Sequence, residues 1–251
     1  MADWGEQLET TVSFLGRNLH VLDLTHELSP EIPHYPGHMK TATWWHLTHE
    51  ECMLRLGDVD TEFEGYAVRG LSTCDHVSTH VDAIYHFNKH RPDLTVDRMP
   101  LELFFTPAAW IDVSFVKPRE HIRLADIRRA LNAAEVRLQP GMTLLYWTGV
   151  ERLWGEPLRY VQEYPGLDGE ATDWILDQGI VNVCTDASST DSPADPTYPN
   201  HLRHGRRSVI HTENVANMTK IPRHQNFQYL FLPLKLAGGT GCPIRAMALW
   251  E

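Results

Sequence analysis

Three imidazoles and two carboxylates lie within the fourteen residues 74–87, CDHVSTHVDAIYHF. His76 and His80 are four residues apart, and Asp82 follows two residues later. On an extended segment, where side chains alternate, all three would project to the same side; on a helix the histidines would share a face and Asp82 would turn away from it. Two neutral imidazoles and a carboxylate suit a borderline divalent ion such as zinc, with manganese or iron as competitors. The spacing therefore predicts a metal site.

His86 is left over once these three residues are assigned to an ion. An imidazole beside a metal site can serve as the general acid or base that a metal-activated water requires. The alternative is purely structural, because a chain with 15 histidines contains some chance clusters. The cluster is interleaved with apolar Val77, Val81 and Ile84, and buried charged groups need partners. A bound metal is therefore the preferred explanation.

The composition is that of an ordinary globular protein, with 251 residues, 42% hydrophobic and 22% charged. A net charge of −11 disfavours nucleic acid and anionic membranes as partners. The first residues, MADWGE, show neither a basic start nor an apolar run, and no stretch approaches the roughly 18 apolar residues of a membrane span. The four cysteines form no CxxC pair, which indicates reduced thiols. We expect a cytoplasmic protein.

Local patterns predict an α/β middle section. Strand patterns at 108–113, 142–147 and 180–184 alternate with helix patterns at 124–134 and 169–178. This alternation favours partly parallel pairing of the strands.

Outside the middle section, the patterns predict a short helix within residues 1–20 and a polar hairpin or loop over 55–65. Strands are expected at 21–26, around 44–46, at 208–212 and at 229–236, and a long polar loop at 185–200. No internal repeat or linker is evident, so we expect one domain over residues 1–251.

The histidine cluster resembles the H-x-G-T-H-x-D-x3-H-F signature of the cyclase family of metal-dependent hydrolases, which includes bacterial kynurenine formamidase and isatin hydrolase. The resemblance continues through most of the chain. It is carried by the segments DLT at 23–25, YPG at 35–37, YWTG at 146–149, PGL at 165–167, CTD at 184–186 with Asp191, LPLK at 232–235 and GGTGCPIRA at 238–246.

This resemblance implies a fold and a set of site residues. The fold is α/β, a single domain with a mixed sheet in the swivelling β/β/α arrangement of the kynurenine formamidase-like cyclase family. By position, His76, His80 and Asp82 match the ligands of a first ion, and His201 and Glu213 match those of a second ion that Asp82 would bridge. His86 matches the catalytic histidine. The resemblance also makes a homodimer or homotetramer plausible.

The implied activity is hydrolysis of an amide-type C–N bond by a metal-activated water. The substrate would be a small molecule, either an aryl formamide such as N-formylkynurenine or a cyclic amide such as isatin. The cofactor would be one or two divalent ions, Zn²⁺ first and Mn²⁺ as the alternative. Two departures from the family pattern, Ser78 and Cys184 where glycine is usual, leave substrate identity open.

Other functions stay open at this point. A lactone hydrolase would use the same chemistry, and a decyclising or isomerising enzyme would differ only in not consuming water. A non-catalytic metal-binding protein is a third reading, disfavoured by the intact ligand set and His86.

Five aromatic residues are candidates for the substrate pocket: Trp44, Trp45, Phe63, Tyr66 and Phe87. The competing reading for them is the core, which is the commoner fate of aromatic side chains, and for the adjacent tryptophans also an oligomer contact.

Overall fold

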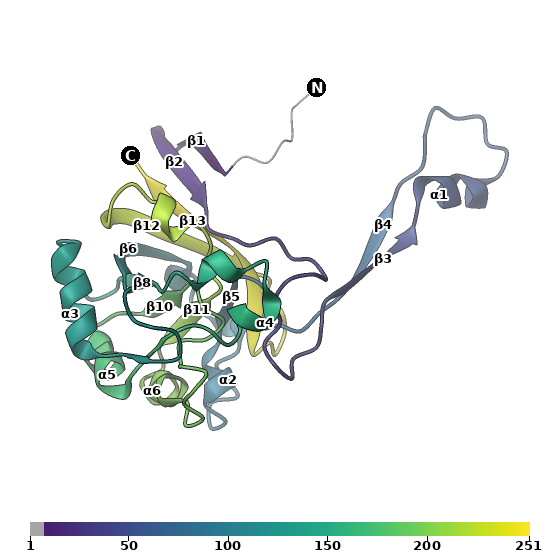
Figure 1. The fold of residues 1–251 in the computed structure, drawn as a ribbon. Helices are drawn as coiled ribbons and strands as arrows, with labels where there is room; N and C mark the ends of the chain where they lie inside the picture. Colours follow the sequence, from purple (N-terminus) through teal and green to yellow (C-terminus); the bar gives the residue numbers. More distant parts are fainter. Residues whose placement is uncertain (1–7) are drawn as a thin grey trace.

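A nine-stranded mixed sheet dominates the computed structural model, which describes residues 8–251 (Figure 1). In spatial order the strands are β1 (Glu9–Phe14), β2 (Arg17–Asp23), β13 (Gly241–Trp250), β12 (Gln225–Pro233), β6 (Phe105–Asp112), β8 (Thr143–Trp147), β10 (Asn182–Thr185), β11 (Ile210–Glu213) and β5 (His80–Asp82). Strands β6, β8, β10 and β11 run parallel to one another, and the other pairs are antiparallel. The predicted α/β class with a mixed sheet is confirmed.

The short strand β5 closes this sheet into a barrel. It pairs with β11 on one side and with the first residues of β13 on the other. The later residues of β13 instead pair with β2, so the N-terminal hairpin continues the sheet outside the closed part. Closure matters because it carries residues 80–82 into the middle of strands from the C-terminal third of the chain.

Helices α3 (Leu124–Ala133) and α5 (Gly169–Asp177) cover the outer face of the parallel strands (Figure 1). Alternation along β6 separates two cores: Ala109 and Ile111 pack with the helices, whereas Ala108 and Trp110 face the other side. Helix α5 begins where the Asp168 carboxylate accepts the Ala171 N–H, and ends before Gly179, whose φ is +79°. Such capping and spacing signals are local.

The remaining elements are short. They are α2 (Ile84–Phe87), α4 (Pro157–Tyr160), α6 (Pro199–Arg207), the two-residue strands β7 (His121–Ile122) and β9 (Gly166–Leu167), and the 3₁₀ turns Val96–Arg98, Leu101–Phe104, Val150–Leu153 and Met218–Lys220. The long polar stretch predicted at 185–200 is a loop until α6 begins.

An arm projects from the barrel, made of β3 (Ala42–Leu47), α1 (His49–Leu56) and β4 (Val68–Ser72) (Figure 1). The Trp44 indole lies across the paired Gly70, a position where any side chain would overlap the ring. Trp45 pairs with Arg69, whose guanidinium lies 5.2 Å from the ring centroid. Helix α1 ends at Leu56, so the loop predicted to begin at residue 55 begins two residues later, at Gly57.

The helix predicted within residues 1–20 is wrong for the described part; residues 1–7 lie outside it. Strands β1 and β2 form a hairpin whose turn places Leu15 and Gly16 at φ of 50° and 75°. Two consecutive positive φ values suit the turn that matches the twist of paired strands, so the turn favours the hairpin. Among the helices of residues 8–251, none has the length and apolarity that a membrane crossing requires.

Gly166 is packed against the backbone of Asp191 and Ser192, where an added Cβ would overlap main-chain atoms. We predict that Gly166→Ala lowers the free energy of unfolding by about 1–3 kcal/mol or more, because backbone cannot move aside as a flexible side chain can. Urea denaturation measures this. Gly155→Ala is the matched control, since a Cβ there meets no heavy atom within 4 Å; equal stability of the two variants would contradict the packing described.

Candidate metal centre

The first group of ligand-type side chains comes from β5 and the loop before it. Because β5 is extended, His80 and Asp82 project to the same side of the strand. His76 reaches them from the preceding loop, with Nδ1 2.7 Å from Asp82 Oδ1. His80 Nε2 lies 3.2 Å from the same oxygen. The three residues of the predicted cluster therefore converge on one point.

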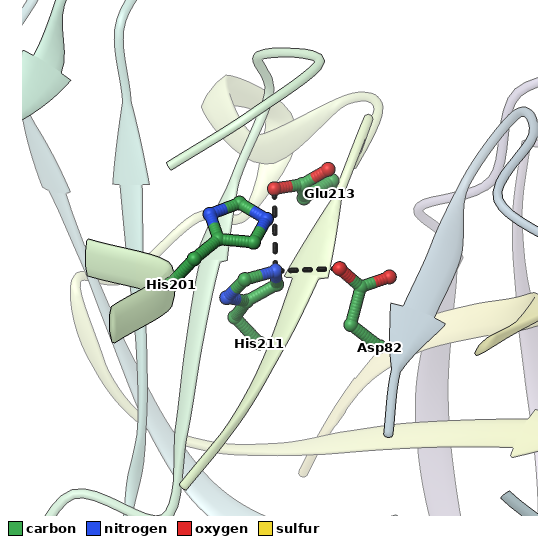
Figure 2. A group of neighbouring side chains, drawn as sticks. All are labelled: Asp82, His201, His211 and Glu213. Atoms are coloured by element: carbon green, nitrogen blue, oxygen red, sulfur yellow. Dashed lines mark hydrogen bonds and ion pairs between the residues drawn. The ribbon is translucent and has the colours of Figure 1, made fainter. Parts of the chain in front are cut away.

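A second group contains Asp82 again, together with His201, His211 and Glu213 (Figure 2). Their ligand atoms all lie within 4.8 Å of one another. The register of β11 against β5 sets His211 opposite Asp82 and Glu213 opposite His80. His201 comes from the first turns of α6. Asp82 is thus shared between the two groups, which is the arrangement that a bridging carboxylate requires.

The electrostatics of this cluster favour a bound cation, which would allow both buried carboxylates to ionise. Burial and the nearby Asp82 raise the pKa of Glu213 well above its usual range. Burial opposes ionisation of Asp82, yet the surrounding His76, His86 and His211 hold its pKa well below the usual range. Imidazole nitrogens and carboxylate oxygens are the donors that zinc and manganese take in proteins. The residues present fit one or two divalent ions.

Three of the histidines have one ring nitrogen bonded away from the centre. His201 Nδ1 lies 2.6 Å from Asp191 Oδ2, and His80 Nδ1 lies 2.9 Å from the Ser78 carbonyl oxygen. Such outer partners fix which nitrogen is free to bind a metal, and they orient the ring.

His76 also has an outer partner, Thr240, which is in turn hydrogen-bonded to Asp75. Its Nε2 lies 2.9 Å from the Thr240 hydroxyl, which donates to Asp75 over 2.8 Å. In all three histidines the second nitrogen faces the cluster.

His86 lies beside the cluster, with Nε2 3.7 Å from Asp82 Oδ2 and its ring 4.0 Å from that of His76. Burial lowers the pKa of His86 to about 3, so the imidazole is neutral at pH 7. A neutral ring has a free lone pair, and although burial disfavours the protonated ring, the nearby Asp82 carboxylate favours it.

A cavity of about 210 Å³ opens onto these side chains. Its walls also include Tyr35, His38, Ser188, Ser189 and Tyr198. The hydroxyls of Tyr35 and Tyr198 lie 3.0 Å apart. The cavity therefore combines flat rings with hydroxyl groups near the ligand cluster.

The structure does not bring four of the predicted pocket aromatics to this cavity. Trp44, Trp45, Phe63 and Tyr66 belong to the arm and its tip, each with about half of its surface exposed. The fifth, Phe87, packs edge-on against the His201 ring rather than lining the cavity. The physical reason is that the strands of the arm pair only with each other and leave the barrel.

Sequence reasoning missed His211, the role of Asp75 with Thr240, and the cavity residues Tyr35 and His38. Only His211 carried a usable signal, because it stands two residues before Glu213 on a strand pattern and must share its face. The others depend on contacts between distant segments.

We predict that Thr240→Val weakens zinc binding by about 10–100-fold, the usual effect of losing an outer partner of a metal-binding histidine. The valine keeps the shape but removes the hydroxyl that joins His76 to Asp75. Competition with a chromophoric chelator measures the affinity. Thr240→Ser, which keeps the hydroxyl, should stay near the wild-type value; equal affinity in the valine variant would refute this role.

Comparison with known proteins agrees with this geometry. Residues 22–192 match the family model described as "Putative cyclase". The kynurenine formamidase of Salinibacter ruber is 27% identical over 236 residues, covering 90% of this chain and 96% of that protein. The isatin hydrolase of Roseibium aggregatum is 24% identical over 209 residues, covering 78% and 79%.

Solved structures share the fold. Isatin hydrolase A from Ralstonia solanacearum superposes with a TM-score of 0.80 at 22% identity, covering 93% of this chain and 92% of that one. An isatin hydrolase bound to the product analogue thioisatinate gives a TM-score of 0.79 at 23% identity, covering 92% of both chains. The family model matches more than half of this chain, and the ligand cluster is in place. The chain therefore belongs to the cyclase family of metal-dependent hydrolases.

Proposed function

We propose that this protein hydrolyses an amide-type C–N bond in a small molecule, either an aryl formamide such as N-formylkynurenine or a cyclic amide such as isatin. The observation that carries the proposal is the pair of ligand groups that share Asp82, at a cavity with His86 alongside. Relatives named kynurenine formamidase and isatin hydrolase support the type of bond.

The ligand set supports a centre of one or two ions, Zn²⁺ first and Mn²⁺ as the alternative. His76, His80 and Asp82 would hold the first ion; Asp82, His201 and Glu213 would hold the second. When bound, such ions polarise a carbonyl oxygen and lower the pKa of water toward neutrality. Ser78 adds a hydroxyl where glycine is usual, but that hydroxyl donates to the His26 carbonyl oxygen and so points away from the ligands.

His86 is the residue that we assign to proton transfer. Its Nε2 faces Asp82 at the edge of the ligand cluster, and the ring is neutral at pH 7. It would accept a proton at Nε2 from the attacking water and return it to the leaving nitrogen. His76 and Phe87 pack against its ring and restrict its orientation.

The cavity favours a compact, planar substrate. Its 210 Å³ is below the roughly 300–1,000 Å³ of pockets for drug-sized ligands. Tyr35, His38 and Tyr198 offer flat surfaces, on which an aromatic ring stacks favourably. The serine hydroxyls at 188 and 189 supply polar groups for a carbonyl or carboxylate.

The test is turnover of N-formylkynurenine, isatin and a small panel of lactones by the zinc-loaded and manganese-loaded protein. We predict turnover of a C–N substrate, and a loss of about 10²–10⁴-fold in kcat for His86→Ala at unchanged metal content, the usual contribution of a general acid–base residue. Full kcat in that variant would remove His86 from the mechanism. Turnover of lactones alone would assign the protein to ester hydrolysis, and a product without the mass of an added water would exclude hydrolysis.

We further propose that the protein is a homodimer or homotetramer held together by the arm. Large apolar side chains on β3, α1, β4 and the loop between α1 and β4 are exposed: Trp44, Trp45, Leu54, Leu56, Val59, Phe63, Tyr66, Val68 and Leu71. So many exposed large apolar side chains on one projecting element support an interface there. The barrel carries an apolar groove over β1, β2, β12 and β13. The arm of one copy could therefore pack against this groove on a second copy.

Light scattering coupled to size exclusion tests the assembly. We predict a dimer or tetramer for the wild type and a smaller species for the double variant Trp45→Asp, Leu54→Asp, because two charges in an apolar interface are costly to bury. Lys89→Asp, in the exposed turn that follows α2, is the control for a charge change away from the arm. A monomeric wild type would refute the proposal.

The cytoplasm is the compartment that we propose. All four cysteines are free, and three of them are buried, as expected in a reducing environment.

A further inference from the structure

His211 lies in the ligand cluster, but it is not one of the metal ligands that the family resemblance implies. Its Nε2 lies 2.7 Å from Asp82 Oδ2 and 3.3 Å from Glu213 Oε1 (Figure 2). The residue is completely buried. Its place follows from the strand register, because His211 is paired directly with Asp82 across the β5–β11 ladder and shares a face of β11 with Glu213. It is either a further metal ligand or a hydrogen-bond donor to Asp82 that lies beside Glu213.

The surroundings of the other ring nitrogen, Nδ1, distinguish between these two roles. His76, His80 and His201 each bond one nitrogen to a hydroxyl, a carbonyl or a carboxylate, as metal-binding histidines usually do. In contrast, the buried Nδ1 of His211 has no hydrogen-bond partner among residues 8–251.

If Nε2 bound a metal, the proton of the neutral ring would sit on Nδ1. It would then be a buried N–H without an acceptor, which costs about 1–3 kcal/mol. With the proton on Nε2, the N–H donates to Asp82 Oδ2 with Glu213 Oε1 nearby, and only an acceptor lone pair on Nδ1 is left unpaired. Orphaned buried acceptors are better tolerated than orphaned buried N–H groups.

We infer that His211 is a positioning residue and not a ligand: its ring donates the Nε2 proton to Asp82, lies beside Glu213, and holds the two carboxylates in a fixed relation. The inference rests on the proposed metal centre. It leaves the second ion with His201, Asp82 and Glu213 as protein ligands, the number found in catalytic zinc sites that keep a position open for water or substrate. An additional imidazole at that ion would fill the open position.

Matched substitutions test the inference. Gln places an N–H near the position of the histidine Nε2 but is a poor ligand for zinc. We expect His211→Gln to retain the wild-type metal stoichiometry, zinc affinity within about threefold, and the visible spectrum of the cobalt-substituted protein. His211→Leu, which cannot donate, should bind zinc about 10–100-fold more weakly. His201→Gln, the same change at a ligand, should lose an ion and alter the cobalt spectrum.

Other outcomes overturn the inference. If His211→Gln loses an ion and changes the cobalt spectrum as His201→Gln does, His211 is a ligand. If His211→Leu binds zinc as the wild type does, the hydrogen bond from His211 to Asp82 has no positioning role. A wild type without stoichiometric metal would instead refute the proposed function itself, so the two failures are distinguishable.

A measurement on the unsubstituted protein covers the case in which a variant does not fold. In the zinc-loaded wild type, nitrogen NMR of labelled histidines should show His211 protonated at Nε2. A metal-bound Nε2 at His211 would contradict the assignment.

Discussion

Two carboxylates, Asp82 and Glu213, are buried in a cluster whose ligand atoms all lie within 4.8 Å of one another, and the rest of the site is arranged around that constraint. Like charges at this range in a poorly solvated interior repel strongly, so one must be neutralised or both must face cations. The histidines around them supply donors and ring nitrogens rather than permanent charge. Ions between its members would relieve this repulsion, and this electrostatic argument, together with the convergence of the ligand atoms, makes the cluster a candidate metal centre.

The barrel supplies the rigidity that such a cluster needs. Strand β5 has only three residues, but its two neighbours β11 and β13 hold it on both edges. The outer partners come from further segments: Asp191 from the loop after β10, and Thr240 with Asp75 from the turns beside β13 and β5. The rings of His201 and His76 are therefore oriented by segments other than their own, whereas His80 is oriented by the carbonyl of Ser78 just before it. Functional geometry of this precision depends on rigid elements with a supporting outer layer.

Local sequence signals were sufficient for the middle of the chain. Strands β6, β8 and β10 and helices α3 and α5 all lie within a few residues of their predicted positions, because apolar periodicity and capping residues act over short distances. The histidine cluster was predictable for the same reason. The N-terminal hairpin was missed because its residues are largely exposed and lack a clear apolar alternation.

The closure of the barrel, the arm and the position of His211 opposite Asp82 depend on pairing between distant strands. No local pattern encodes that pairing. The fold family could be predicted from the resemblance of the sequence motifs. The hydrogen bonds around the site could not, because they join segments that are far apart in the chain.

The distance along the chain between the two halves of the site has a consequence for its biosynthesis. Asp82 and His211 are 129 residues apart, and His76 and Thr240 are 164 apart. At a translation rate of about 5–20 residues per second, the early imidazoles wait roughly 6–25 s before β11 is even synthesised. During that interval the nascent chain offers only a partial, solvent-exposed chelate. The complete ligand set forms only when the last strands have closed the barrel, so it would be available to an ion only when synthesis of the chain is nearly finished.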